Sequence, residues 1–146
     1  MKKPMQFNTK TIHGGQEPDP AYGAVMPPIY QTSTYAQVEP GGHKGYEYSR
    51  THNPTRTALE KSMASIENGE YGLCFASGLA AIDAVIKLLQ PGDEVLSSND
   101  LYGGSYRLFA KIFEGMGIRF HFVDLTDPQR VAEKLNDKTK LIWIET

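Results

Sequence analysis

From about residue 53 onward, short apolar runs alternate with segments whose apolar residues recur at helical spacing. The apolar runs predict strands at residues 71–76, 94–98, 118–123 and 141–144. The helical spacing predicts helices that begin at Asn53-Pro54 and Asp127-Pro128, and two more over residues 79–89 and 105–114. Because strands and helices alternate with connections long enough for parallel crossovers, the pattern indicates an α/β fold with a mainly parallel sheet.

This pattern leads to two specific expectations about buried side chains. In the helix over 105–114, the apolar side chains that we expect to face the core are Leu108, Phe109, Ile112 and Phe113. Cys74 lies inside the apolar run 71–76, where we expect a small buried side chain rather than a reactive thiol.

Residues 1–52 differ from the rest of the chain. They are rich in proline and glycine, and no helical or strand period persists there for more than a few residues. The segment nevertheless holds many large apolar and aromatic side chains, namely Tyr22, Met26, Ile29, Tyr30, Tyr35, Tyr46 and Tyr48. We therefore expect an arm that docks on a neighbouring subunit, with a poorly ordered tail as the alternative.

Ser77 and Gly78 join the run 71–76 to the helix over 79–89. Such a turn leaves the first backbone N–H groups of the helix unpaired at its positive end, where a phosphate binds without a cationic side chain. The alternative is an ordinary turn between a strand and a helix, because small residues are common there.

In parallel sheets, ligands gather beyond the carboxyl ends of the strands. The segments expected along that edge are Ser77-Gly78, Asp100–Gly104, Asp124 and Glu145-Thr146. Tyr102 lies there between an aspartate and two glycines, so its ring either stacks on a flat cofactor or caps its own loop.

The amino-acid composition excludes several classes of function for this chain. With 40% hydrophobic and 22% charged residues and a net charge of −2, the chain is globular in composition and has no basic block for nucleic acid or membrane surfaces. The single cysteine suits a reducing cytoplasm. The four histidines lack metal-ligand spacing, so we expect no metal site. Because there is no basic block, we also expect no nucleic-acid or membrane partner.

Three motifs, taken together, resemble one enzyme family. The segments are Tyr46–Arg56, Phe75–Ala81 and Asp100–Arg107, and the resemblance extends over nearly the whole chain from Thr11 onward. They look like the Cys/Met-metabolism family of pyridoxal-phosphate (PLP) enzymes, which includes cystathionine γ-synthase, cystathionine γ-lyase, cystathionine β-lyase and methionine γ-lyase. The resemblance implies the aspartate-aminotransferase-type fold (fold type I) and a homotetramer built as a dimer of dimers.

The resemblance also implies residue roles at the cofactor. Ser77, Gly78 and Leu79 match the turn whose backbone N–H groups hold the cofactor phosphate. Tyr102 matches the tyrosine that stacks on the pyridine ring and is a candidate proton relay.

Four further residues match positions that reach the cofactor or the substrate from elsewhere. Tyr48 and Arg50 match arm residues that contact the cofactor phosphate of the neighbouring subunit, where a hydroxyl and a charge suit a phosphate dianion. Arg107 and Glu47 match the substrate end of the pocket.

By the same resemblance, the lysine that forms the Schiff base with the cofactor lies beyond Thr146. We therefore expect residues 1–52 to be the arm, residues 53–146 an incomplete PLP-binding large domain, and this chain inactive by itself. The complete enzyme would carry out γ-elimination or γ-replacement on sulfur amino acids, as in transsulfuration. The alternatives are a non-catalytic α/β module that binds a phosphorylated ligand, a purely structural piece of an oligomer, and, within the family, a cystathionine β-lyase or methionine γ-lyase.

Overall fold

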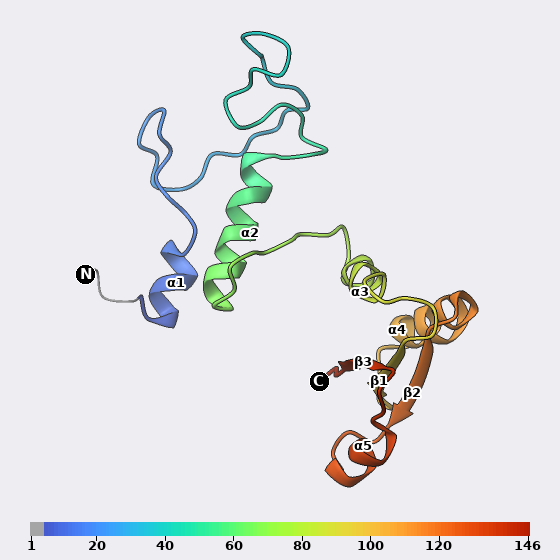
Figure 1. The fold of residues 1–146 in the computed structure, drawn as a ribbon. Coiled ribbons are helices and arrows are strands. Elements are labelled where there is room, and N and C mark those ends of the chain that lie inside the picture. Colours follow the sequence, from blue (N-terminus) through green and yellow to red (C-terminus); the bar gives the residue numbers. More distant parts are fainter. Residues whose placement is uncertain (1–4) are drawn as a thin grey trace. The chain divides into compact units, whose positions relative to one another are not determined.

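The computed structural model describes residues 5–146 and divides into two compact units between Cys74 and Phe75 (Figure 1). The described part of the first unit, residues 5–74, contains two helices and a long loop. The second unit contains a three-stranded sheet with its helices.

The first unit is built on helices α1 (Phe7–His13) and α2 (Pro54–Ile66). Helix α2 begins where the sequence predicts, because the Asn53 side chain accepts the backbone N–H of Thr55 at 2.9 Å and Pro54 follows it. Helix α1 lies in the segment predicted to be irregular, so that prediction is wrong for these residues. The two helices pack closely because Gly15, at φ +70°, lies directly against the backbone of α2, where a Cβ would collide with the Lys61 carbonyl.

The loop between α1 and α2 is irregular, as predicted. Its last part is held by an isolated antiparallel bridge between Thr34 and Tyr48 and by a hydrogen bond from the Tyr35 N–H to the Glu47 carbonyl at 3.1 Å. Several large side chains of the loop face solvent, with Tyr22 95%, Ile29 85% and Val38 83% exposed. The unit therefore leaves much apolar surface uncovered.

Residues 71–76 do not form the predicted strand. Residues 71–74 lie against α2, where the Cys74 N–H donates to the Glu60 carboxylate at 3.1 Å. No strand of the described chain pairs with them, and Tyr71 and Leu73 are 81% and 77% exposed. An apolar run becomes a strand only when a neighbour pairs with it, and here α2 takes that place. Cys74 is consequently half-buried rather than buried.

The second unit alternates helices and strands. In chain order they are α3 (Gly78–Ile86), β1 (Glu94–Ser98), α4 (Gly103–Leu108), β2 (Arg119–Val123), α5 (Pro128–Lys134) and β3 (Thr139–Trp143). The strands lie in the order β2-β1-β3 and all pairings are parallel, with Val95 opposite Phe120 on one side and opposite Leu141 on the other. These features confirm the predicted α/β class and the parallel sheet.

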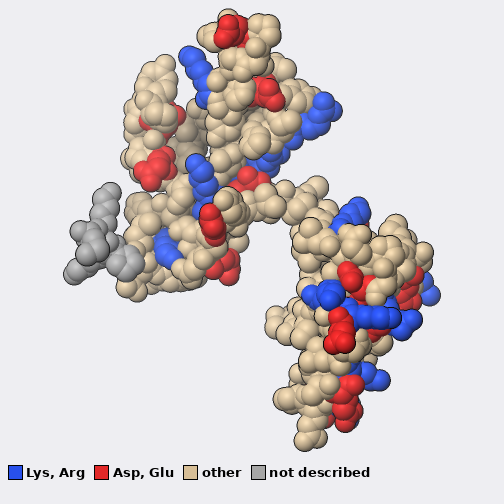
Figure 2. Space-filling view, in the orientation of Figure 1, with Lys and Arg blue, Asp and Glu red and all other residues tan. Residues whose placement is uncertain are grey.

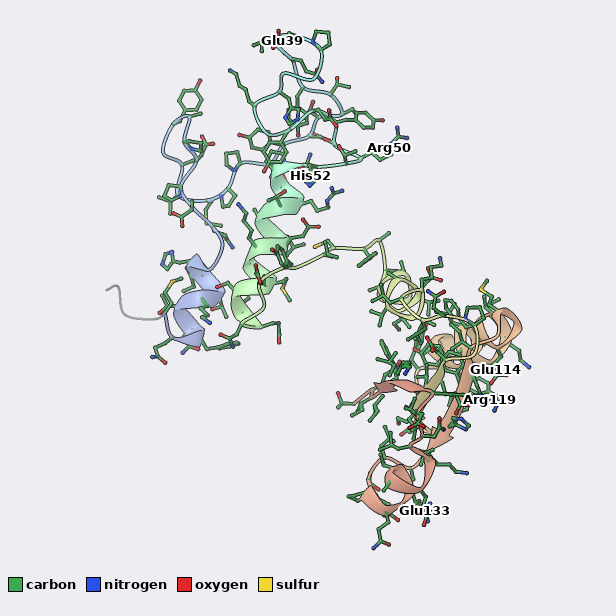
Figure 3. All side chains as sticks on the ribbon, viewed as in Figure 1. Glu39, Arg50, His52, Glu114, Arg119 and Glu133 are labelled. Atoms are coloured by element: carbon green, nitrogen blue, oxygen red, sulfur yellow. The ribbon has the colours of Figure 1, made fainter. Side chains whose placement is uncertain are left out.

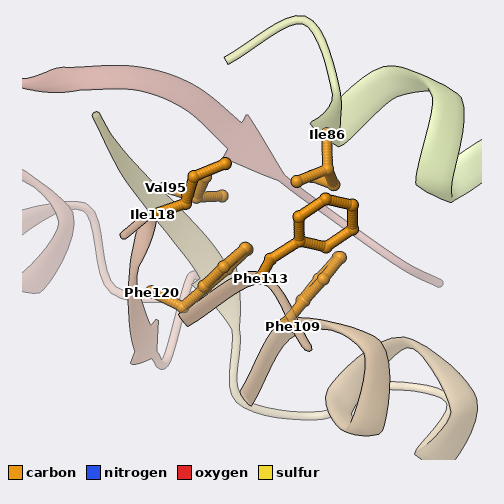
Figure 4. Packing of buried hydrophobic residues seen from close by; sticks show 6 residues of the cluster. All are labelled: Ile86, Val95, Phe109, Phe113, Ile118 and Phe120. Atoms are coloured by element: carbon orange, nitrogen blue, oxygen red, sulfur yellow. The ribbon is translucent and has the colours of Figure 1, made fainter. Parts of the chain in front are cut away.

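The core of the second unit lies around the central strand β1, every residue of which is buried. Figure 4 shows the cluster, which consists of Ile86, Val95, Phe109, Phe113, Ile118 and Phe120. The Phe109 ring stacks on Phe120 with centroids 4.6 Å apart and meets Trp143 edge-on at 5.8 Å. Phe109 therefore joins α4, β2 and β3 in one packed centre.

The helix predicted over 105–114 changes geometry along its length. After α4 it continues as a π-helical turn over Phe109–Phe113 and a 3₁₀ turn over Glu114–Met116. Phe109 and Phe113 face the core as predicted, but Ile112 is 48% exposed, so its predicted burial is wrong. The wider π turn shifts the residues after Leu108 relative to an α-helical face, and periodicity alone does not reveal that shift.

Charged side chains of both signs intermix on the visible face of each unit (Figure 2). Neither sign dominates there, in agreement with the net charge of −2. Within residues 5–146, no helix combines the length and apolar character needed to cross a membrane.

Candidate cofactor-binding site

An open hollow of about 390 Å³ lies at the carboxyl ends of β1 and β3 in the second unit. Its lining comes from three stretches of the chain and comprises Ser77, Gly78, Leu79, Ile82, Tyr102, Ser105, Trp143 and Glu145. The structure thus brings together Ser77-Gly78, Tyr102 and Glu145, as expected for one edge of a parallel sheet.

Asp124, which follows β2, is not part of this lining. Its carboxylate accepts the Thr126 hydroxyl at 2.6 Å and lies 3.8 Å from Arg130. The hydrogen bond from the Thr126 hydroxyl is the main reason that the pKa of Asp124 is lowered. Asp124 lies at the predicted edge, because β2 is parallel to β1 with Val123 opposite Ser98. Its side chain does not reach the hollow, because it is used in the turn that leads to α5.

Helix α3 presents its N-terminus to the hollow. The Ser77 hydroxyl oxygen accepts the backbone N–H of Ala80 at 3.1 Å, which caps the helix. In the described chain, nothing accepts the N–H groups of Gly78 and Leu79. Apart from its chain neighbours and the backbone of α3 itself, no atom of the described residues lies within 4 Å of the position where Gly78 would carry a Cβ, so an anion can approach these two donors.

Tyr102 stands at the N-terminus of α4 with 65% of its surface exposed. Its ring lies against Gly104, where an added Cβ would collide with ring atoms and come within 2.9 Å of Cζ. Gly104 is buried, so the ring rests on bare backbone. A glycine is required here for the ring to keep this position.

Glu145 connects β3 to the Tyr102 loop. Its carboxylate accepts the Tyr102 backbone N–H at 2.8 Å, the Ser105 hydroxyl at 2.5 Å and the Trp143 indole N–H at 2.9 Å. Partial burial raises the pKa of Glu145, but these three hydrogen bonds outweigh burial and hold the pKa below its ordinary value. Sequence reasoning placed Glu145 at this edge without giving it a role; its one signal was an acidic residue directly after a strand.

A second hydrogen-bonded carboxylate lies at the opposite end of the strands. Glu94, the first residue of β1, accepts Asn136 at 3.0 Å, contacts His121 Nε2 at 2.7 Å and lies 3.4 Å from Arg119 Nη1. The hydrogen bond from Asn136 is the largest cause of its lowered pKa, followed by that with His121. This cluster fastens β1 to β2 and to the start of β3, away from the hollow.

The remaining predicted residues lie outside the hollow lining. Arg107 is exposed on α4, and its guanidinium lies beside Gly103, 3.5 Å from where a Cβ would be. Tyr48, Arg50 and Glu47 belong to the first unit. Arg50 Cζ lies 4.9 Å from the centroid of the Tyr48 ring, and the Arg50 side chain projects outward from its loop (Figure 3). Glu47 is exposed.

The sequence profile of the family described as Cys/Met metabolism PLP-dependent enzyme matches residues 8–146. The chain belongs to this family. The cofactor of the Cys/Met-metabolism enzymes is pyridoxal 5′-phosphate, and their fold is fold type I, as the resemblance implied.

Individual members of the family are similar to this chain over almost its whole length. The cystathionine beta-lyase of Coxiella burnetii is 52% identical over 99% of this chain, and a probable cystathionine gamma-synthase of Herpetosiphon aurantiacus is 50% identical over 96%. A solved cystathionine gamma-lyase of Lactobacillus plantarum, complexed with L-serine, superposes with a TM-score of 0.90 at 44% identity over 97% of this chain. The chain covers 38%, 44% and 37% of these three proteins, respectively.

The residues around the hollow fit the family's cofactor. The N–H groups of Gly78 and Leu79 have no acceptor within the described chain and suit a phosphate. The exposed Tyr102 ring on the same rim offers a flat apolar face for a pyridine ring. Both features required by a phosphorylated aromatic ring are therefore present on one side of the sheet.

Proposed function

We propose that this chain is the N-terminal part of a PLP-dependent enzyme that carries out γ-elimination or γ-replacement on sulfur amino acids. The observation that carries the proposal is the hollow, where the helix N-terminus at Gly78 and the ring of Tyr102 line the same cavity. The family match over residues 8–146 supplies the chemistry for that arrangement. Bound PLP withdraws electrons from the substrate amino acid, so that a proton can leave its Cα.

In this proposal, the backbone N–H groups of Ser77, Gly78 and Leu79 bind the cofactor phosphate. The uncapped N–H groups of Gly78 and Leu79 support that role. Tyr102 stacks on the cofactor ring and keeps water from that face, and its hydroxyl is a candidate proton relay. The exposure of the Tyr102 side chain supports this role because the stacking face is available.

We further propose that the arm docks on a neighbouring subunit and that the enzyme is a dimer of dimers. The exposed apolar side chains of the first unit, with Ile29 85% and Val38 83% exposed, support a partner that covers them. Tyr48 and Arg50 then reach the phosphate in the neighbouring subunit. Their side chains already lie together, 4.9 Å apart from guanidinium carbon to ring centroid, so a hydroxyl and a positive charge can approach one phosphate together.

Arg107 and Glu47 are proposed for the substrate end of the pocket. The exposed Arg107 carries a positive charge on α4, the helix that directly follows Tyr102, and this charge supports a place near a polar group of the substrate. A cytoplasmic location is part of the same proposal, supported by the single cysteine.

Cystathionine β-lyase activity is the second candidate. It is favoured by the 52% identity to the beta-lyase of Coxiella burnetii. The two activities cut different bonds of cystathionine. Cleavage at Cγ–S releases cysteine with a four-carbon oxo acid and ammonia, whereas cleavage at Cβ–S releases homocysteine, pyruvate and ammonia.

The deciding experiment incubates the full-length protein and PLP with cystathionine, and separately with an O-acylhomoserine plus cysteine. Mass spectrometry of the products is the readout. We expect cysteine and 2-oxobutanoate from the first mixture, or cystathionine from the second. Homocysteine and pyruvate would replace the γ assignment by the β assignment. A protein that binds PLP without forming any of these products would contradict both.

A further inference from the structure

The geometry points to Glu145 as the positioning residue for Tyr102, holding the ring where the proposed cofactor stacks. This inference rests on the proposed function, and it concerns a residue to which neither the motifs nor the family match assigns a role. Glu145 follows the last strand, and 43 residues separate it from Tyr102 in sequence.

Both oxygens of the Glu145 carboxylate accept hydrogen bonds. One oxygen accepts the Tyr102 N–H, and the other accepts both Ser105, which is fully buried, and the Trp143 indole. Three donors from two separate segments therefore meet a single side chain. Removing the acceptor leaves the buried Ser105 hydroxyl without its partner and frees the first turn of α4.

Few other contacts hold the Tyr102 side chain in place. Its side chain is 65% exposed and makes no side-chain hydrogen bond to the described residues. The contact with Gly104 fixes the position of one face of the ring. The hydrogen bond to Glu145 fixes the position of the Tyr102 backbone, from which the ring projects. Movement at either contact moves the stacking face.

The negative charge of Glu145 is held by neutral groups at the start of α4. No Lys, Arg or His of the described chain forms an ion pair with Glu145, so the carboxylate is stabilised by neutral donors alone. It sits at the N-terminus of α4, where the helix dipole favours a negative charge. An amide at this position keeps the size, but it turns an NH₂ group toward one of the N–H donors.

The test compares Glu145→Gln with Glu94→Gln in the full-length protein. Both variants remove a carboxylate that is held by hydrogen bonds at one end of the sheet, but only Glu145 contacts the Tyr102 loop. We expect Glu145→Gln to raise the PLP dissociation constant of the apoprotein, measured by equilibrium dialysis, about tenfold. It should also weaken the visible circular dichroism per bound cofactor. Glu94→Gln should lower thermal stability and leave both readouts unchanged.

A double-mutant cycle separates positioning from general damage. In a Tyr102→Ala background, Glu145→Gln should change the PLP dissociation constant less than twofold, because the ring through which it acts is gone. An undiminished tenfold effect in that background would overturn the inference. Glu145→Asp provides a second variant that keeps the charge, and we expect it also to weaken binding, since its shorter side chain cannot span Tyr102 and Trp143 together.

One readout is independent of cofactor. In the apoprotein labelled with 3-fluorotyrosine, the ¹⁹F resonance of Tyr102, assigned by Tyr102→Phe, should shift in Glu145→Gln and stay in place in Glu94→Gln. An unchanged resonance in Glu145→Gln would refute the positioning role. Failure of the unaltered protein to bind PLP would instead refute the proposed function, and the fluorine signal would still decide whether Glu145 positions Tyr102.

Discussion

The Glu145 carboxylate accepts the backbone N–H of Tyr102 at 2.8 Å and thereby ties the end of β3 to the start of α4. Both residues follow parallel strands, which bring their ends to one edge of the sheet. The aromatic ring on that edge is therefore held from two sides, by Glu145 through the backbone and by Gly104 beneath the ring.

Gly104→Ala should displace the Tyr102 ring, because the new Cβ would lie within 2.9 Å of the ring atom Cζ. Alanine favours the helix over glycine by about 1 kcal/mol, so a loss of PLP affinity would come from the collision and not from the helix. We expect the PLP dissociation constant to rise by about tenfold or more. Gly115→Ala is the matched control, since no atom lies within 4 Å of its Cβ position, and it should bind PLP normally. Equal affinities for the two variants would count against the ring contact.

Ser77→Ala should loosen the first turn of α3, because the hydroxyl that accepts the Ala80 N–H is lost. Loss of such a cap costs about 1 kcal/mol, so amide exchange in that turn should quicken about fivefold, and PLP binding should weaken with it. Asp127→Ala removes the corresponding cap of α5, where the side chain accepts the Gln129 N–H at 2.9 Å. That control should lose protection in α5 alone, and weaker PLP binding there would argue against a special role for the α3 terminus. Hydrogen–deuterium exchange measures the first effect and dialysis the second.

Glu145 should make stability depend on pH in the acid range. Its pKa in the folded protein lies below the ordinary 4.5, so the stabilisation is fully present above about pH 4.5 and disappears as the pH falls through the lowered folded-state pKa. The stability difference between the unaltered protein and Glu145→Gln should therefore shrink as the pH falls below about 4.5. Denaturant unfolding at several pH values measures it. A difference that stays constant down to pH values below the folded-state pKa would contradict the ionised, hydrogen-bonded state.

Arg50→Ala should weaken PLP binding in the full-length protein if Arg50 reaches a phosphate across a subunit interface. A hydrogen bond to a charged group is worth about 1.5–3 kcal/mol, which corresponds to about a ten- to hundredfold loss of affinity. Arg130 is the control because its ion pairs with Asp124 and Asp127 lie at the surface, and Arg130→Ala should change PLP binding by less than about 0.5 kcal/mol.

Subunit mixing tests whether Arg50 acts in the neighbouring subunit. Arg50→Ala subunits are combined with subunits whose cofactor-binding lysine is replaced, each nearly inactive alone. If sites are shared, one site of each mixed dimer gathers both defects and the other is intact, so activity returns. Absence of recovery after confirmed subunit exchange would rule out the shared site.

Residues 1–146 expressed alone should associate or aggregate. Strand β3 has β1 on one side and no strand of the described chain on the other, while Ile142 and Ile144 are 45% and 64% exposed. An apolar strand with an open edge pairs with other chains. Analytical ultracentrifugation measures the association. A monomer with a single cooperative thermal transition would contradict the prediction.

Local sequence determined much of the fold. The starts of α2 and α5 could be predicted from Asn53-Pro54 and Asp127-Pro128, because a cap hydrogen bond and a proline act within two residues. The parallel strands could be predicted from their apolar runs and spacing, and the resemblance of three motifs identified the family. The hollow at Ser77-Gly78 and Tyr102 also followed from the rule that parallel strands bring their carboxyl ends to one edge.

Only the tertiary structure decided the features that depend on distant partners. Residues 71–76 have the composition of a strand, yet no strand of the described chain pairs with them, and Cys74 instead donates to Glu60 of α2. A strand requires a neighbour that local sequence does not supply. Ile112 is exposed because a π turn shifts the helix face. Glu145 contacts Tyr102 across 43 residues, and Gly104 supports the ring, because packing of α4 against the sheet brings these groups within hydrogen-bond and van der Waals distance. Sequence periodicity describes one element at a time, whereas these contacts join several.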